Sequence, residues 1–407
     1  MTTDAITVVP DGSVTTPKGY EAGATYAGLK VQRDGVLDLG ILVSRRPAAV
    51  AGTFTVSNIK SPSVTLSQNR LRPGKARAVV ANSGCANTCV GDQGYKDAEE
   101  STALAARHLG MSSDEFLMCS TGLIGAELPM ALIRAGIPKI TLSPNGGHDF
   151  ANAIRTTDKF AKALAVTFDL GGTRVSIGGC AKGAGMIHPQ MATMLAFVTT
   201  DAAVESSFLQ ACLSEVADST FNMISVDGDM STNDTLLLFA NGAAGGPTVR
   251  AGTPEAARFQ QALHHVCRHL SHEIVRDGEG ATKVMEVTVA GARTLEDARV
   301  AARSISSSLL VKAAVHGNDP NWGRIMMAVG KSRAYLEDDK IAVYLNDVCL
   351  MEHGLPIPFF REAVVLSMRS NPTVRFRVEL NVGKASATAW GCDISQEYVH
   401  FNSAYVT

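Results

Sequence analysis

One segment of the chain, residues 182–198, combines a lysine, two glycines, a histidine and a threonine ahead of a run of apolar residues. The run from Met194 to Val198 predicts a buried strand, in which Thr193 would be an ordinary first residue because threonine favours strands. A nucleophilic role for Thr193 is the less favoured alternative, because a threonine hydroxyl within a chain has no base nearby. Cleavage of the bond between Ala192 and Thr193 would release an α-amine, which titrates at about 7.7–8.0 and serves as a base for the hydroxyl of the same residue. The residues alone favour the strand interpretation.

The glycines around Lys182 do not complete a nucleotide-binding motif. A Walker loop places its lysine directly after a glycine, whereas Lys182 precedes Gly183. A dinucleotide-binding fingerprint also fails, because His188 stands where a third glycine belongs. A second glycine-rich string, residues 120–125, indicates tight turns or a close approach of the backbone to a ligand.

Other reactive residues are expected to have structural roles. The sequence contains no Gly-x-Ser-x-Gly elbow, which argues against an α/β-hydrolase. Cys119 has no histidine nearby in the sequence and is expected to be buried, while Cys85 and Cys89 match no common zinc or redox spacing. Three histidines four and three residues apart lie off the apolar face of a predicted helix, so we expect them to face solvent and to bind no metal. They are His265, His269 and His272.

The composition is that of a folded protein without a polyanionic partner. Of 407 residues, 45% are hydrophobic and 19% charged, with a formal charge of −2, so neither disorder nor nucleic-acid binding is indicated. The N-terminal residues lack the apolar region of a signal peptide, and no run approaches the roughly 18 apolar residues of a membrane span. Eight scattered cysteines are typical of reduced thiols. We therefore expect a cytoplasmic protein that contacts no membrane.

Helix and strand patterns alternate along the chain and predict a mixed α/β fold. Helical spacing predicts helices at residues 95–109, ended by Gly110, and at residues 203–221 and 254–276. Thr294 is placed to cap a further helix that begins near Leu295. Alternating polar and apolar residues predict strands at 285–289 and 374–380, in addition to the apolar strand that follows Thr193.

Residues 182–195 closely resemble the self-cleavage signature of the ornithine acetyltransferase (bifunctional glutamate N-acetyltransferase) family. Further blocks resemble that family in its own order from about residue 82 to the last residue. They are residues 82–87, 120–125, 156–158, 231–235, 277–283, 316–324 and 402–407. The chain departs from the family pattern at Ala184, Gln190 and Met230. None of these changes removes a group that the chemistry needs, although Met230 would affect selectivity if it lay near the pocket.

The resemblance implies a fold and a processing step. The fold would be a four-layer αββα sandwich of the N-terminal-nucleophile kind, with a smaller α/β subdomain at roughly residues 284–395. Self-cleavage before Thr193 would give an α chain, residues 1–192, and a β chain, residues 193–407. Both pieces would stay together as one catalytic unit, and several such units would form a higher oligomer.

The resemblance also implies an activity in arginine biosynthesis or a specialised pathway. The acetyl group of N2-acetyl-L-ornithine would pass to Thr193 and then to L-glutamate. Thr121 and Gly122 would stabilise the oxyanion. Lys182 would bind a substrate α-carboxylate and Glu279 the δ-ammonium of ornithine. The implied substrate contacts are Thr156, Lys182, Thr193, Glu279, Asn402 and Thr407. No metal or cofactor is expected, and whether acetyl-CoA is a second donor stays open.

Two alternatives remain at this point. An N-terminal-nucleophile aminopeptidase or amidase would pass the acyl group to water instead of glutamate. A non-catalytic binding protein could keep the fold, although the set formed by Thr121, Gly122, Lys182 and Thr193 argues against it. Residues 319–324, which contain Trp322, would support either the site or an interface between the two pieces.

Overall fold

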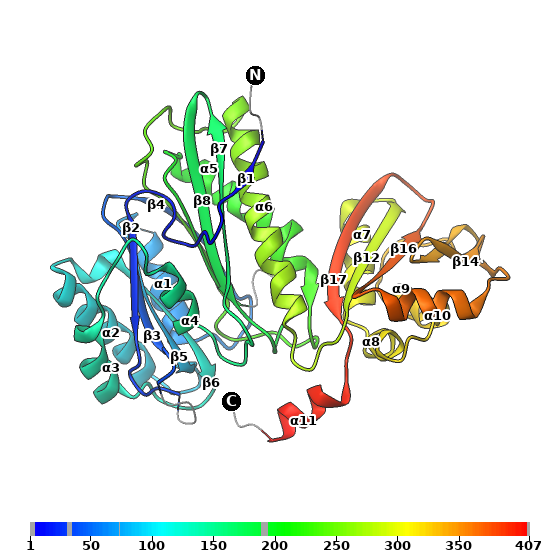
Figure 1. The fold of residues 1–407 in the computed structure, drawn as a ribbon, viewed down its shortest axis with the longest axis horizontal. Helices are drawn as coiled ribbons and strands as arrows, with labels where there is room; N and C mark the ends of the chain where they lie inside the picture. Colours follow the sequence, from blue (N-terminus) through cyan, green and yellow to red (C-terminus); the bar gives the residue numbers. More distant parts are fainter. Residues whose placement is uncertain (1–4, 31–34, 73, 189–193, 405–407) are drawn as a thin grey trace.

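The computed structural model describes residues 5–30, 35–72, 74–188 and 194–404, and these form two lobes (Figure 1). The first lobe contains two sheets that pack face to face. One has the strand order β1-β7-β8-β9-β11-β4 and the other β2-β3-β5-β6. The strands of the first are β1 Thr7–Val8, β7 Lys162–Leu170, β8 Thr173–Lys182, β9 Leu195–Thr200, β11 Thr235–Ala240 and β4 Ala49–Phe54. Those of the second are β2 Tyr20–Thr25, β3 Leu39–Ser44, β5 Ala78–Cys85 and β6 Phe116–Leu123.

Helices cover the outer face of each sheet, which gives four layers in the order α, β, β, α. A core that includes Leu117, Phe197 and Phe239 fills the space between the sheets. On the outside of the six-stranded sheet lie α5 (Ser206–Ser219) and α6 (Pro254–Arg276). The outside of the four-stranded sheet is covered by α1 (Pro62–Leu71), α2 (Gln93–Leu109) and α3 (Met130–Gly136), while α4 (Gly147–Ala153) packs on β2 and β3. The expected four-layer sandwich is confirmed.

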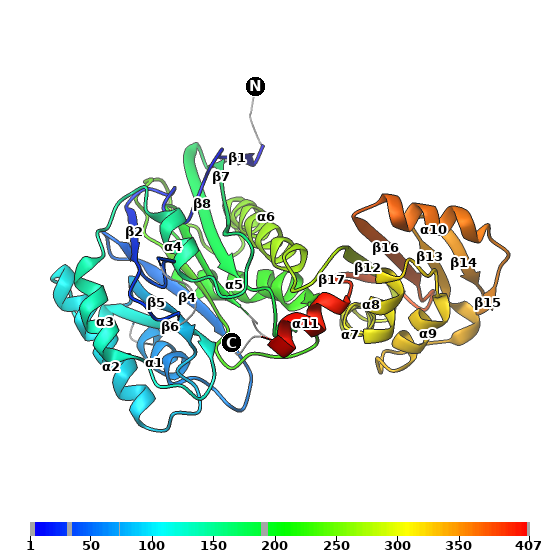
Figure 2. The ribbon, with the colours of Figure 1, turned by 60° about the horizontal axis from the view of Figure 1, so that its bottom comes forward.

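The second lobe, residues 284–392, is built on a seven-stranded sheet and lies to one side of the first (Figure 2). Its strand order is β10-β17-β12-β16-β13-β14-β15. The strands are β10 Ile224–Ser225, β12 Val284–Ala292, β13 Ala342–Leu345, β14 Val348–Glu352, β15 Leu355–Pro356, β16 Thr373–Glu379 and β17 Ala385–Cys392. The helices are α7 Leu295–Ser306, α8 Leu309–His316, α9 Trp322–Gly330 and α10 Arg361–Ser370. Because β10 comes from the first lobe and pairs with β17, the two lobes share this sheet.

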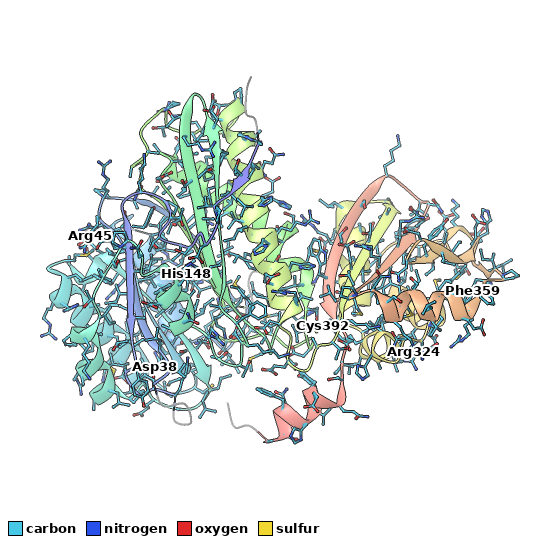
Figure 3. The ribbon with its side chains drawn as sticks, in the orientation of Figure 1. Asp38, Arg45, His148, Arg324, Phe359 and Cys392 are labelled. Atoms are coloured by element: carbon cyan, nitrogen blue, oxygen red, sulfur yellow. The ribbon has the colours of Figure 1, made fainter. Side chains whose placement is uncertain are left out.

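The chain leaves the second lobe through the C-terminal helix α11 (Gln396–Ala404), which both views place beside the junction of the lobes (Figures 1 and 2). The Ser395 hydroxyl donates to the carbonyl of Gly280 over 2.6 Å, so the two linkers that join the lobes contact each other. Figure 3 labels Cys392 at the end of β17, where this junction begins.

Most predicted elements are present, with small shifts at their ends. The helix at 254–276 has the predicted bounds, and Thr294 caps α7 by accepting a hydrogen bond from the Asp297 amide. Gly110 ends α2 in the left-handed conformation, with φ 66°. The helix predicted at 203–221 is shorter, because Glu205 is extended and Thr220 leaves helical geometry. The strand expected after Thr193 is β9, whereas Thr193 itself lies outside the described residues.

Candidate active site

A polar cavity lies where β6, β8 and β9 meet, at the ends of strands from both sheets of the first lobe. Six residues predicted for the site line it, contributed by β6, the loop before β7, β8, the linker after α6, and α11. They are Thr121, Gly122, Thr156, Lys182, Glu279 and Asn402. Met194 and Leu195, at the start of β9, line the same cavity. Ala192, Thr193 and Thr407 lie outside the described residues, but Thr193 is bonded to Met194.

Lys182, at the end of β8, joins two of the predicted site residues. Its ammonium group lies 2.9 Å from the Thr121 hydroxyl and 3.1 Å from the Thr156 hydroxyl. The side chain is buried, and this desolvation lowers the pKa of Lys182, while the carboxylates of Asp158, Asp234 and Glu279 act in the opposite direction. The cavity therefore holds a cation donor surrounded by acidic groups.

Gly122, which follows Thr121 near the end of β6, must be a glycine for steric reasons. Its φ is +129°, and a Cβ atom would lie 2.3 Å from the carbonyl carbon of Gly84 on the neighbouring strand β5. Only glycine tolerates both the conformation and the close approach. The glycine thus sets the course of the backbone that carries the candidate oxyanion donors.

Asp158, to which the sequence gave no role, binds several residues beneath the cavity. One carboxylate oxygen accepts from Lys162 Nζ over 2.6 Å and from the Gly183 amide over 2.7 Å, and the other accepts from the Thr156 amide over 3.0 Å. Burial alone would raise the pKa of Asp158, but Lys162, Lys182 and the Gly183 amide hold it below its usual range. Lys162 also pairs with Asp277 over 2.6 Å, and both partners are fully buried. Asp158 thus positions Thr156 and Gly183, the residue that follows Lys182.

Glu279 and Asn402 form an acidic end of the cavity. The Asn402 amide donates to Glu279 Oε2 over 2.9 Å, which brings the C-terminal helix to the linker after α6. Gly185 packs directly against this carboxylate, because a Cβ atom there would lie 2.5 Å from it. A side chain at position 185 would displace the Glu279 carboxylate from this place.

Asn233 and Asp234, just before β11, are two further polar residues to which the sequence gave no role. The Asn233 amide donates to the carbonyls of Ala86 and Ser120, which fixes the residue that precedes Thr121. Asp234 lines the cavity, and its Oδ2 has no hydrogen-bond partner among the described residues. Burial raises the pKa of Asp234 well above its ordinary value, which Lys182 and Ser231 offset in part. The feature of the sequence that could have indicated these roles is the run of polar residues directly before the apolar strand β11.

Several other candidates lie away from the cavity. Cys119 is buried, and desolvation raises the pKa of its thiol to about 12, so it is no thiolate nucleophile at neutral pH. Residues 316–324 lie at the end of α8 and the start of α9 in the second lobe, where Figure 3 labels Arg324. Met230 is not among the residues that line the cavity.

The sequence predicted that three histidines of α6 would face solvent, and the structure places them there only in part. His265 is exposed, and His269 and His272 are half-buried. Within residues 5–30, 35–72, 74–188 and 194–404, no group of three or more potential ligands could hold a metal ion. In the same ranges no helix is long and apolar enough to cross a membrane.

The four layers, with a polar cavity at the beginning of an inner strand, define a fold of the N-terminal-nucleophile class. The chain matches the ArgJ family over residues 21–407, and it belongs to that family. The arginine biosynthesis bifunctional protein ArgJ of Symbiobacterium thermophilum is 48% identical over 398 residues, which cover 97% of this chain and 99% of the relative. The protein of the same name from Dehalococcoides mccartyi is 46% identical over 403 residues, 99% of each chain.

A solved structure supports the same assignment. The crystal structure of the arginine biosynthesis bifunctional protein ArgJ from Bacillus halodurans is 39% identical in sequence, with a TM-score of 0.51. The match covers 98% of that chain but 51% of this one.

Proposed function

We propose that this chain transfers the acetyl group of N2-acetyl-L-ornithine to L-glutamate, giving L-ornithine and N-acetyl-L-glutamate. The observation that carries the proposal is the pair of opposite charges in one cavity, with Lys182 at the Thr121 and Thr156 hydroxyls and Glu279 beside Asn402. A cation and a carboxylate in one site suit an amino-acid substrate, since they bind its α-carboxylate and its side-chain ammonium.

The nucleophile of the proposal is Thr193 after self-cleavage. Its Oγ attacks the carbonyl carbon of Ala192, the peptide C–N bond breaks, and the hydroxyl proton passes to the freed α-nitrogen. Water then hydrolyses the resulting ester and restores the hydroxyl, which leaves residues 1–192 and 193–407. In the mature enzyme the α-amine of Thr193 takes the hydroxyl proton during attack on substrate, as in other threonine nucleophiles with an N-terminal amine.

Acetyl transfer then follows in two steps. Thr193 attacks the acetyl carbonyl of N2-acetylornithine, the amide bond breaks, and the amine of ornithine leaves with a proton while an acetyl ester forms. The amine of glutamate attacks this ester, the bond between the acetyl carbon and Thr193 Oγ breaks, and a proton from the attacking amine restores the hydroxyl. Thr121 and the Gly122 amide donate to the oxyanion in both steps, a contribution of about 2.7–4 kcal/mol for each donor. No metal or cofactor takes part in this scheme.

The topology supports continued association of the two cleavage products. β8 precedes the cleavage position and β9 follows it, and the two strands pair from Ile177↔Thr200 to Lys182↔Leu195. β11, from the second product, pairs with β4, from the first, so the sheet mixes strands from both products. The length of the Bacillus halodurans chain, which matches 51% of this one, is close to that expected for one product. We further propose that these two-piece units assemble into a higher oligomer in the cytoplasm.

Two measurements test the proposal. The intact mass of the denatured wild-type protein is expected to show two species with a new N-terminus at Thr193, whereas Thr193→Ala should remain a single chain. Wild-type protein supplied with labelled N2-acetylornithine should form labelled N-acetylglutamate. Release of free acetate at the same rate without glutamate would instead indicate a hydrolase, and a single uncleaved chain with full activity would exclude Thr193 as the nucleophile.

A further inference from the structure

The turn at residues 184–188, between β8 and the cleavage position, has an uncommon backbone conformation. Met186 has φ +56°, a region that residues other than glycine rarely occupy. Its side chain is 43% exposed, so packing of this side chain contributes little to holding the turn. Such a conformation persists only where the surroundings hold it in place.

The carboxylate of Asp227 supplies this support. Its Oδ2 accepts from the Met186 amide over 2.6 Å, and its Oδ1 accepts from the Ile187 amide over 2.9 Å. The neighbouring Val226 amide donates to the carbonyl of Ile187 over 2.7 Å. Since hydrogen bonds to a charged acceptor are stronger than neutral ones, the two contacts to Asp227 dominate this set.

His188, the last described residue of the turn, is held through its ring. Nε2 lies 3.1 Å from Nη2 of Arg303 on α7, and Nδ1 lies 3.1 Å from the Ser225 hydroxyl. A guanidinium only donates, so Nε2 accepts and the neutral ring carries its hydrogen on Nδ1, which donates to Ser225. Arg303 also donates to the carbonyl of Asn222, which fixes its own position.

We propose that Asp227 is a positioning residue for self-cleavage, assisted by the contacts of His188 with Ser225 and Arg303. The inference rests on the proposed function, because it assumes a cleavage four residues beyond His188. An intramolecular acyl shift depends strongly on the orientation of the reacting groups, and the turn sets the direction in which the chain approaches the cleavage position. Once the bond is cut, acetyl transfer no longer needs this direction, although the turn still lines the cavity through Gly185, Met186 and Ile187.

Asp227 has further contacts, which the experiment must separate. Its Oδ1 also accepts from the backbone amide of Asp229 over 3.1 Å, a bond that Asp229→Asn leaves in place. Tyr398 on α11 also interacts with Asp227, since burial and then the charge of Asp227 raise the pKa of its phenol, and α11 carries Asn402 of the cavity. Tyr398→Phe removes this contact alone and leaves the turn unchanged. The exposed carboxylate Asp229 lies two residues from Asp227 and gives a matched control.

The test follows the first-order loss of full-length chain by denaturing mass spectrometry after a pulse of synthesis. Asp227→Ala is expected to cleave at least roughly tenfold more slowly than wild type, since both charge-assisted contacts are lost. Asp227→Asn keeps the shape and one acceptor oxygen, so its cleavage rate should lie between those of Asp227→Ala and wild type. Asp229→Asn and Tyr398→Phe should cleave at the wild-type rate.

Melting temperature and acetyl transfer per cleaved chain are measured on the same samples. Slow cleavage by Asp227→Asn at an unchanged melting temperature, with a much smaller loss in transfer per cleaved chain, supports the proposal. Cleavage of Asp227→Ala and Asp227→Asn at the wild-type rate overturns it, as does a loss that only follows the melting temperature. If the wild-type chain does not cleave at all, the proposed function itself fails, which is a separate result.

Discussion

The ammonium group of Lys182 lies 2.9 Å from the hydroxyl oxygen of Thr121, and this contact orients the hydroxyl. An ammonium group only donates, so the Thr121 oxygen must accept, and its own hydrogen remains available for another acceptor. An oxyanion in the cavity is the acceptor that the proposed reaction provides. In the proposed reaction, the cation that binds substrate thus also orients the oxyanion donor.

Lys182→Met should therefore remove two functions at once. The variant loses the cation for the substrate carboxylate and the group that orients Thr121, so we expect kcat/KM for acetyl transfer to fall by roughly 100-fold or more. The measurement is steady-state transfer from N2-acetylornithine to glutamate, corrected for the cleaved fraction. Lys159→Met, an exposed lysine in the adjacent loop, is the control. Activity of Lys182→Met close to that of the control would contradict this role.

Asp234→Asn is expected to stabilise the fold at neutral and alkaline pH. Burial raises the pKa of Asp234, so the folded state binds its proton more tightly than the unfolded chain does. Stability from this group is therefore complete below the unfolded pKa and is lost as the pH rises toward the folded pKa. Asparagine has the same shape without this loss. The melting temperature of the variant should exceed that of wild type at pH 8, and the difference should shrink at pH 5. An equal difference at the two pH values would contradict a raised pKa of Asp234 in the folded state.

Local patterns in the sequence predicted much of the fold because they reflect one element at a time. The helix α6 has its predicted bounds, since Thr253 caps it and its apolar residues recur at helical spacing. The alternation in residues 374–380 placed β16 to within one residue at each end. The four-layer arrangement, in contrast, came from the resemblance, because periodicity alone does not say which strands are neighbours.

The site was predictable only in part for a related reason. Resemblance supplied Lys182, Thr156 and Glu279, whereas the roles of Asp158 and Asp227 depend on contacts between distant segments. Asp158 meets the Gly183 amide 25 residues away, and Asp227 meets the Met186 amide 41 residues away. Nothing in the spacing of charged residues reveals such pairs.

The half-buried ring of His188 should make the fold sensitive to acid. Burial, with smaller effects of Arg303 and Lys312, lowers the pKa of His188 to about 4. Between the ordinary histidine pKa of about 6.5 and this value the unfolded chain binds a proton that the folded chain does not, so stability is lost as the pH falls through that window. His188→Gln can keep one donor and one acceptor without titrating. From urea unfolding at pH 7 and pH 5, we expect the variant to lose less stability than wild type by on the order of 2 kcal/mol.

The exposed His265 provides the control for that measurement. His265→Gln should lose stability toward pH 5 as wild type does. If His188→Gln followed the same curve as His265→Gln, the ring of His188 would not be buried in its neutral form.

Removal of residues 402–407 should separate activity from cleavage. Asn402 contacts Glu279 in the cavity, yet α11 contains no fully buried residue, so the core does not depend on its last turn. We expect the shortened chain to cleave nearly normally and to lose acetyl transfer. Val399→Ala, which changes an exposed side chain on the same helix, is the control. Normal turnover by the shortened chain would show that Asn402 does not serve the site.

Lys162→Met tests whether the buried ion group beneath the site stabilises the first lobe. Lys162 lies 2.6 Å from both Asp158 and Asp277, and all three side chains are fully buried. Loss of the lysine leaves two carboxylates without their cation, for which we expect a loss of about 3–5 kcal/mol in urea unfolding at pH 7. The triple variant Lys162→Met, Asp158→Asn, Asp277→Asn should regain part of this loss, because no unpaired charge remains. Acetyl transfer should stay low even then, since a neutral amide at position 158 accepts more weakly from the amides of Thr156 and Gly183 than the carboxylate does. If Lys162→Met alone were as stable as wild type, the three groups would not form a stabilising ion network.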